Sequence, residues 1–250
     1  ESFGGLGPLC AVADPISVAK ANELCAGFGL DTISTGGTIA FAMECQEKGL
    51  LKDTSFQPKF GSGDDLVEAI RKIAYREGLG DWMAEGSVRM SNKIDPQTKA
   101  FLAEARGQEL PLHDPRFKNT TGMGYALSPT GADHMHNLID NFANFAGSDV
   151  CTRLEEMGME TPLPLFGISE QKVQGYIYET AFKNVLDSAV ICHFYPYEYR
   201  HLVEALNAAA EWDINKDEIN RIGTRIITMA RIYLLREGFS HSDDRISARA

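Results

Sequence analysis

Three short segments concentrate groups that could do chemistry, and the first is rich in glycine and hydroxyl residues. GLDTISTGGT, residues 29–38, holds three Gly, Asp31 and four Ser or Thr residues. When such a run precedes a helix, the free N–H groups of the helix N-terminus can bind an anion such as a phosphate. Asp31 could accept hydrogen bonds from ligand N–H or O–H groups. A plain turn between two helices, with Asp31 or a Thr as the N-cap, explains the same residues.

The second segment, SPTGADHMHN at residues 128–137, holds two histidines. We expect His134 and His136 at the start of a helix, where a spacing of two puts them on different faces and disfavours one shared metal ion. His134 alone, beside a loop, could donate or accept a proton. A surface histidine near a helix start is the alternative interpretation.

The third segment, LDSAVICHF at residues 186–194, places Asp187, Cys192 and His193 near the end of a long apolar helix. Cys192 could be a buried small apolar residue, as free cysteines often are. It could also supply one thiolate to an iron–sulfur cluster whose other ligands come from elsewhere. The five cysteines are odd in number and include no CxxC pair, which favours a reducing compartment over a disulfide framework.

The elements that must position these segments are mostly helices, because apolar residues recur at helical spacing and almost no stretch alternates with period two. We expect a mainly α chain with two helical domains, residues 1–104 and 105–250. Loop-rich stretches are expected at 109–129 and 157–167. The expected helices cover 15–28, about 38–48, a segment capped by Asp64, a short one around 82–90, about 132–145, 169–192, 197–211 and 216–236.

Composition limits the class of protein. The 250 residues are 44% hydrophobic, and 24 Lys and Arg against 35 Asp and Glu give a net charge of −11. This balance suits a folded globular protein, and the acidic charge argues against nucleic acid or an anionic membrane as the main partner. No apolar run approaches the roughly 18–20 residues that span a bilayer. The chain begins at Glu1 without an initiator Met, so we expect it to derive from a longer polypeptide.

The segment ANELCAGFGLDTISTGGTIAFAMECQEKG, residues 21–49, closely resembles the tungsten-containing aldehyde ferredoxin oxidoreductases. The resemblance covers nearly the whole chain and continues, in order, through REGLGDWMAEGS, ELPLHDPR, GMGYALSPTGADH, LDSAVICHF and REGFSHSDD. It implies helical domains 2 and 3 of a three-domain enzyme, without its β-rich first domain. It also implies a tungsten ion held by two pterin dithiolenes (a molybdopterin-type cofactor) beside a [4Fe–4S] cluster. Both would be incomplete without the N-terminal part of the family's enzymes, which holds the three-cysteine cluster motif and the first domain's pterin contacts.

The family's functional positions carry over residue by residue. Glu1 and His134 fall on active-site positions, and Cys192 falls on the cluster ligand. The first pterin motif, Asp-x-x-Gly-Leu-Asp, here begins with Ala26, and the second, Asp-x-x-Gly-Leu-Cys, has Val190 in place of Gly. The resemblance implies cofactor contacts at Leu30, Asp31, Thr130, His136, Asp187, Ile191 and His193, with Thr130 standing for an Arg and His136 for a Lys.

The resemblance implies oxidation of aldehydes to carboxylic acids, with electrons passed through the cluster to ferredoxin or another low-potential carrier in the cytoplasm. A homodimer is possible, but its metal bridge is not expected, because the bridging Glu-x-x-His position reads Lys-Ala-Asn-Glu at 20–23. Two alternatives stay open. One is a family member with other redox chemistry, such as reduction of an aromatic acyl-CoA; the other is a cofactor-free helical module. The choice between tungsten and molybdenum also stays open, because the dithiolene ligands belong to the pterin.

Overall fold

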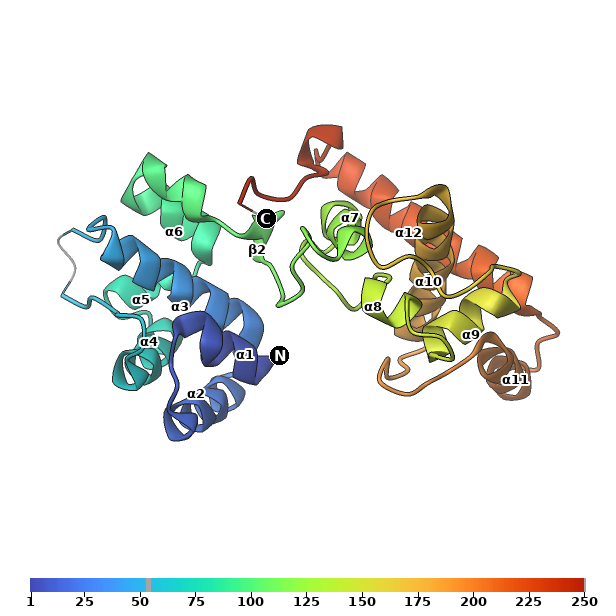
Figure 1. Ribbon diagram of the computed structural model, residues 1–250, viewed down its shortest axis with the longest axis horizontal. Helices are drawn as coiled ribbons and strands as arrows, with labels where there is room; N and C mark the ends of the chain where they lie inside the picture. Colours follow the sequence, from blue (N-terminus) through green and yellow to red (C-terminus); the bar gives the residue numbers. More distant parts are fainter. Residues whose placement is uncertain (53–54, 250) are drawn as a thin grey trace. The chain divides into compact units, whose positions relative to one another are not determined.

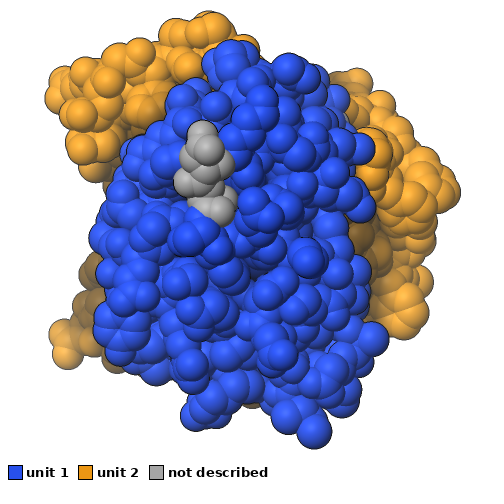
Figure 2. Space-filling view, turned by 90° about the vertical axis from the view of Figure 1, so that its left-hand side faces the viewer, with its two compact units in different colours: residues 1–112, 246–250 blue, residues 113–245 orange. Residues whose placement is uncertain are grey.

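The computed structural model describes residues 1–52 and 55–249, and it is mainly helical (Figure 1). Its residues form two compact units, coloured in Figure 2: unit 1 comprises residues 1–112 and 246–250, and unit 2 comprises 113–245. Unit 1 continues to residue 112 before the chain enters unit 2, and the boundary between family domains expected after residue 104 stays a prediction. The few strands agree with the expectation of a mainly α fold.

Unit 1 is built around a central, largely buried helix, α3. The buried residues of α3 include Ile39, Phe41 and Met43, which join the main apolar core of this unit. One short antiparallel pair of strands follows the helices. The elements are α1 (Ser2–Leu6), η1 (Pro8–Cys10), α2 (Pro15–Phe28), α3 (Thr32–Glu47), α4 (Gly63–Tyr75), α5 (Leu79–Met83), α6 (Ser87–Ile94), η2 (Pro96–Phe101), β1 (Glu104–Ala105) and β2 (Gln108–Glu109).

α2 begins at the residue that its local sequence signals predict. Asp14 caps the helix by accepting hydrogen bonds from the N–H groups of Ile16 and Ser17, and Pro15 occupies the first helical position. The predicted cap of α4 is wrong by two residues, because Ser62 accepts the Asp65 N–H and Asp64 lies inside the first turn. The short helix expected around 82–90 is two helices, α5 and α6, separated at Gly86, whose φ is +83°.

Unit 2 is organised by two long helices that pack closely. Gly223 of α12 lies directly against the backbone of Ala181 in α10, so that an added Cβ would overlap it. Phe182, Val185 and Ile219 fill the core beside this crossing. The elements are α7 (Asn119–Leu127), α8 (Asp140–Ala143), α9 (Asp149–Glu156), α10 (Glu170–Ser188), α11 (Tyr199–Ala210), α12 (Lys216–Arg236) and η3 (His241–Asp243).

A buried ion pair ties α10 to the shorter helices of unit 2. The Nζ of Lys172 lies 2.5 Å from Oδ1 of Asp140, and both side chains are almost fully buried. Asp140 also accepts the N–H groups of Thr120 and Thr121, at 3.2 and 3.0 Å, at the start of α7. Because buried charges are tolerated when they are paired and hydrogen-bonded, these contacts hold α7, α8 and α10 in one arrangement.

The structure corrects two expectations in the middle of the chain. The stretch 109–129 is not loop throughout, because α7 forms despite its two glycines; Gly122 packs on Pro115 and Gly124 packs on Asn137. Tertiary packing here outweighs weak helix propensity. The helix expected over 132–145 shrinks to α8. The Asp133 carboxylate accepts the Met135 N–H, and the Asn137 side chain donates to the Asp133 carbonyl, so side chains compete with helical bonding.

The long helices end close to expectation, with one consequence for the site. α11 and α12 match the expected 197–211 and 216–236 within two residues at each end. α10 stops at Ser188 instead of residue 192, so Cys192 lies beyond the helix. In the described part of the chain, no helix combines the length and apolarity that crossing a membrane requires.

Candidate functional site

The glycine-rich segment of unit 1 is a tight turn followed by the first turns of α3. Gly29 has a φ of +70° and donates its N–H to Ala26, while the Leu30 N–H returns to the Cys25 carbonyl at 2.8 Å. Asp31 then caps α3, with Oδ2 accepting the Ser34 N–H at 2.7 Å. The expectation that residues 29–38 form a loop between helices is wrong from Thr32 onward, and the interpretation of Asp31 as an N-cap is confirmed.

The two adjacent glycines of this segment serve packing. A Cβ on Gly36 would overlap the Gly5 carbonyl oxygen and stand 2.6 Å from its carbon. A Cβ on Gly37 would stand 3.0 Å from Cβ of Glu109 in β2. The glycines therefore let α1 and β2 approach α3 closely, and they do not form an anion-binding loop.

The end of α10 in unit 2 repeats the turn at the end of α2. Val190 has a φ of +57°, its N–H donates to Asp187, and the Ile191 N–H returns to the Leu186 carbonyl at 2.9 Å. Val190 thus occupies the position of Gly29, and Ile191 that of Leu30. Cys192 follows in the position of Asp31. Its side chain is exposed, so the interpretation of Cys192 as a buried apolar residue is wrong, although the other four cysteines are buried.

Three of the predicted site residues of unit 2 come together around one carboxylate. Asp187 Oδ1 lies 2.7 Å from Nε2 of His193, and Asp187 Oδ2 lies 2.7 Å from Nδ1 of His136. The first contact is a hydrogen bond, whereas the second is an ion-pair contact that is poorly aligned for hydrogen bonding. Both oxygens of Asp187 are therefore engaged by imidazole rings.

A second carboxylate completes this cluster. Nε2 of His136 lies 3.2 Å from Oδ2 of Asp133, so a carboxylate faces each nitrogen of the His136 ring. The hydrogen bond from His136 to Asp133 raises the pKa of the imidazole, against the opposing effect of burial. Burial raises the pKa of Asp133, but its contacts with His136 outweigh burial and lower that pKa to about 2. The pair is therefore stabilised as imidazolium and carboxylate.

His193 has one buried polar atom whose partner is missing from the described part of the chain. Its side chain is 9% exposed, Nε2 faces Asp187, and Nδ1 has no hydrogen-bond partner among residues 1–52 and 55–249. Unpaired buried donors and acceptors are uncommon and cost free energy, so this atom is available to form a hydrogen bond with a ligand.

The segment 128–137 carries the other predicted residues of unit 2. Thr130 is exposed, its hydroxyl lies 3.0 Å from that of Ser128, and its N–H donates to the same hydroxyl at 3.3 Å. The Asn137 carbonyl accepts a hydrogen bond from Lys183 of α10 at 2.6 Å. The bond from Lys183 ties the segment to α10, and the contact of His136 with Asp187 brings it to the end of that helix.

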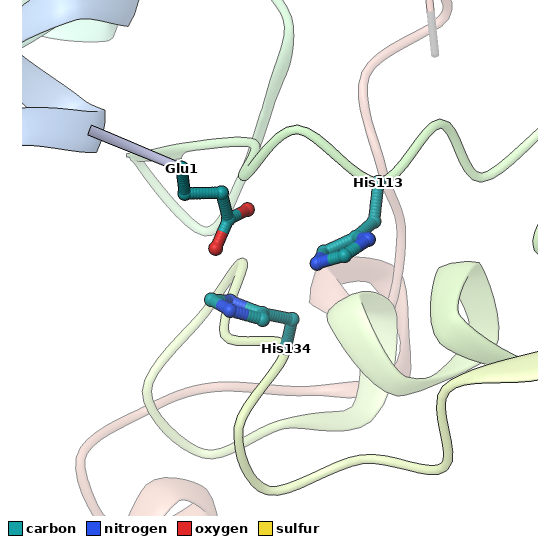
Figure 3. A group of neighbouring side chains, drawn as sticks. All are labelled: Glu1, His113 and His134. Carbon is teal, nitrogen blue, oxygen red and sulfur yellow. The ribbon is translucent and has the colours of Figure 1, made fainter. Parts of the chain in front are cut away.

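His134 lies against a histidine that the sequence analysis did not select. The rings of His113 and His134 have centroids 4.9 Å apart with their planes tilted by 43° (Figure 3). Nδ1 of His113 lies 2.6 Å from Nζ of Lys118, and the Tyr125 hydroxyl donates to the His113 carbonyl. The only sequence signal for His113 was its place in ELPLHDPR, one of the segments that carry the family resemblance.

Glu1, the other predicted catalytic residue, belongs to unit 1 and precedes α1. Its side chain is exposed and is labelled in Figure 3. Its Oε1 accepts the Leu112 N–H at 3.0 Å, and its carbonyl accepts the Gly5 N–H at 2.8 Å. These contacts fix the Glu1 backbone and orient its carboxylate within unit 1.

The chain resembles known proteins over its full length. The family model described as aldehyde ferredoxin oxidoreductase, domains 2 and 3, matches residues 1–250. The tungsten-containing aldehyde ferredoxin oxidoreductase of Thermococcus kodakarensis is 35% identical over 98% of this chain and 39% of its own length. The counterpart from Pyrococcus furiosus is 34% identical over the same shares. The chain therefore spans about two fifths of the length of the curated relatives it matches.

The names of more distantly similar proteins refer to other reactions. A protein of Pyrococcus furiosus named aliphatic sulfonate oxidoreductase, WOR-like subunit, is 26% identical over 93% of this chain. Among solved structures, the BamBC active-site complex of benzoyl coenzyme A reductase, in complex with 1,5-dienoyl-CoA, superposes with a TM-score of 0.77 at 17% identity. That superposition covers 100% of this chain and 42% of the other, and at this identity it establishes the fold alone.

Proposed function

The chain belongs to the aldehyde ferredoxin oxidoreductase family, and on that premise we propose that it forms the helical part of a tungsten-pterin enzyme that oxidises aldehydes to carboxylic acids. The observation that carries the proposal is the match of the family model over residues 1–250, a span that includes both pterin motifs. The motifs lie at the ends of α2 and α10, in a left-handed turn of the kind that also ends α3, α4, α9 and α12.

The residues at these turns fit such a cofactor. Asp31 uses Oδ2 as a helix cap and is exposed, so its carboxylate can also accept hydrogen bonds from pterin N–H groups. The N–H groups of Leu30 and Ile191 are engaged within their own turns, so these residues would contact the cofactor through carbonyl oxygens or side chains. Nδ1 of His193 is buried and has no hydrogen-bond partner in the described residues, so it could form a hydrogen bond with the cofactor.

Cys192 would be the one ligand that this chain gives to a [4Fe–4S] cluster. Its thiol is free and exposed, and it lies five residues after Asp187, on the turn that carries the second pterin motif. A thiolate on this turn would keep the cluster near the pterin. The other three cluster thiolates would come from a part of the protein outside this chain.

The proton-handling groups would be Glu1 and His134. Bound tungsten supplies the two-electron redox chemistry. We assign Glu1 to orienting the aldehyde carbonyl and His134 to accepting and releasing the proton at its imidazole. The His113 ring supports His134 by packing against it. Thr130 and His136 would replace the cationic contacts expected at these positions, His136 as an imidazolium held between Asp133 and Asp187.

The electron carrier and the cellular compartment that we propose follow from the same function. Electrons would leave through the cluster to ferredoxin or another low-potential carrier, and the enzyme could act as a homodimer. We place it in the cytoplasm, because its cysteines, all five in the described region, are free thiols as expected in a reducing compartment.

Elemental analysis of the holoenzyme, purified without oxygen from a host that inserts tungsten or molybdenum, tests the proposal. We expect about one tungsten and four irons per polypeptide, together with aldehyde-dependent reduction of a viologen dye. Full tungsten loading without oxidation of any aldehyde would favour another redox reaction, such as reduction of an aromatic acyl-CoA. Protein without tungsten, molybdenum or pterin would contradict the proposal and favour a cofactor-free helical module.

A further inference from the structure

We propose that Asp187 is a positioning residue in this chain, and that Nδ1 of His193 makes the hydrogen bond to the pterin in its place. The assignment rests on the proposed function, and it specifies which atom of the second motif meets the ligand. It predicts that His193 Nδ1 accepts a hydrogen bond from an N–H group of the pterin ring system.

The first argument is that the Asp187 carboxylate is already engaged. Nε2 of His193 is hydrogen-bonded to Oδ1 of Asp187, and Nδ1 of His136 lies against Oδ2. Each distance is 2.7 Å. A pterin N–H that approached Asp187 would meet a carboxylate that is 39% exposed, that already accepts a hydrogen bond from His193, and that has the His136 ring against its other oxygen. His136 is itself held from the other side by Asp133 at 3.2 Å, so it is not free to move away from Asp187.

The second argument concerns which nitrogen of His193 carries the proton. An ionised carboxylate only accepts hydrogen bonds, so the His193 nitrogen that faces Asp187 must be a donor. The neutral ring then has its hydrogen on Nε2 and a lone pair on Nδ1, and a carboxylate often fixes a histidine tautomer in this way. Asp187 therefore presents Nδ1 of His193 as an acceptor, and the matching partner is an N–H donor.

The third argument is the burial of that acceptor beside an exposed surface. Within the described residues Nδ1 has no partner, yet its side chain is 9% exposed. The neighbouring side chains are open to solvent, with Val190 92% and Phe194 87% exposed. Exposed apolar side chains in the same short segment as a buried, unpaired acceptor suit a planar heteroaromatic ligand with N–H donors.

Two substitutions of His193 test the roles of its two ring nitrogens separately. In His193→Gln the amide can reach the place of Nε2 and keep the contact with Asp187, but it leaves nothing at Nδ1. In His193→Asn the amide can take the place of Nδ1, but the contact with Asp187 is lost. We expect the holoenzyme of H193Q to release pterin about tenfold faster than wild type, the effect of losing roughly one hydrogen bond. H193N should release it more slowly than H193Q.

Release is measured by the fluorescence of oxidised pterin after gel filtration, with iron content and the cluster's paramagnetic resonance signal as second readouts. Because Cys192 is unchanged, iron content and signal should match wild type in each variant. His241→Gln, at an imidazole that is 98% exposed, is the matched control and should release pterin at the wild-type rate.

Asp187→Asn tests the positioning role. An Asn amide can donate to Nε2 of His193 and so place the ring proton on Nδ1, which removes the acceptor. D187N should then release pterin as fast as H193Q, and the double variant should release it no faster than either single variant. If D187N fails to fold, as judged by its thermal midpoint, H193Q and H193N decide the question.

Distinct results would overturn the assignment. Wild-type release from H193Q would show that His193 does not contact pterin. Faster release from the double variant than from H193Q would show that Asp187 contacts pterin directly. An H193Q holoenzyme of lower stability with unchanged release would place the partner of Nδ1 in the rest of the protein. Wild-type protein without pterin would instead contradict the proposed function, on which the assignment depends.

Discussion

Gly29 and Val190 adopt the same left-handed backbone conformation at the ends of α2 and α10, with φ of +70° and +57°. Glycine adopts this conformation without strain, whereas a β-branched residue does so at a cost. Val190 is also almost fully exposed, so no buried contact of its side chain offsets the strain. The segment from Asp187 to Cys192 therefore stores backbone strain at Val190, and such strain is typical of functional sites.

Replacing Val190 with Gly should stabilise the protein. Relief of the left-handed strain, about 1–2 kcal/mol, exceeds the entropy that Gly adds to the unfolded chain, which leaves a net gain of about 0.5–1 kcal/mol. Urea unfolding would show a higher midpoint with an unchanged slope. Gly29→Ala is the matched control: its Cβ would meet no atom within 4 Å, so it should lose about 1 kcal/mol from backbone strain alone. A less stable V190G would disprove the strain.

Gly36 should tolerate no side chain, because α1 lies against it. In Gly36→Ala the new methyl group would overlap the Gly5 carbonyl, and overpacking of this kind costs about 1–3 kcal/mol. Gly27→Ala in α2 is the control, since its Cβ would have no neighbour within 4 Å and Ala favours helix by roughly 0.5–1 kcal/mol. Chemical unfolding of both variants checks the pair. Equal stability of G36A and wild type would mean that α1 can shift away from α3.

The buried pair Lys172–Asp140 should be far more important for stability than an exposed pair. Lys172→Met leaves the Asp140 charge buried without its cation, which costs about 3–5 kcal/mol. Lys20→Ala removes an exposed pair with Glu23 and should change the unfolding free energy by less than about 1 kcal/mol. A loss of similar size in the two variants, measured by urea unfolding, would contradict the buried network.

The ion pair between His136 and Asp133 should make stability depend on pH in two directions. The pKa of His136 is raised in the folded protein, so its contribution is complete below the usual pKa of roughly 6.5 and is lost as pH rises through the folded value. The pKa of Asp133 is lowered to about 2, so its contribution is present above its usual pKa and is lost as pH falls toward 2.

Variants at both positions measure this window. The difference in unfolding free energy between wild type and His136→Gln should be largest near pH 5.5, about one unit below the usual histidine pKa, and should shrink at higher pH. Asp133→Asn should lose its deficit in acid, between about pH 4 and pH 2, and again at high pH. A His136→Gln deficit that grows as pH rises would contradict the stabilised imidazolium.

The sequence predicts the elements whose signals are local. The Asp14-Pro15 start of α2 and the regular apolar spacing of α12 lie within the segments themselves, and both helices appear where expected. α7 and the segment 128–137 depend instead on contacts such as Gly124 with Asn137, which a local pattern does not contain. Their helical states were accordingly predicted wrongly.

In the candidate site, too, a local sequence pattern does not reveal the contacts between distant segments. The family resemblance selected Asp187, His136 and His193 individually, and local spacing could not have paired residues from two distant segments. The exposed Cys192 depends on where α10 ends, and Val190 in a left-handed conformation is an unusual helix terminator that sequence rules do not anticipate. His113 shows its relation to His134 only in three dimensions.

Replacing His134 with Ala should abolish aldehyde-dependent dye reduction while tungsten content stays at the wild-type level. Loss of a group that moves a proton slows turnover by about 10²–10⁴-fold, and His134 lies on a segment that other residues hold in place. His113→Phe keeps a ring against His134 and should reduce turnover far less. If H134A retains full activity, the proton role is wrong; if it loses tungsten as well as activity, His134 acts in cofactor binding instead.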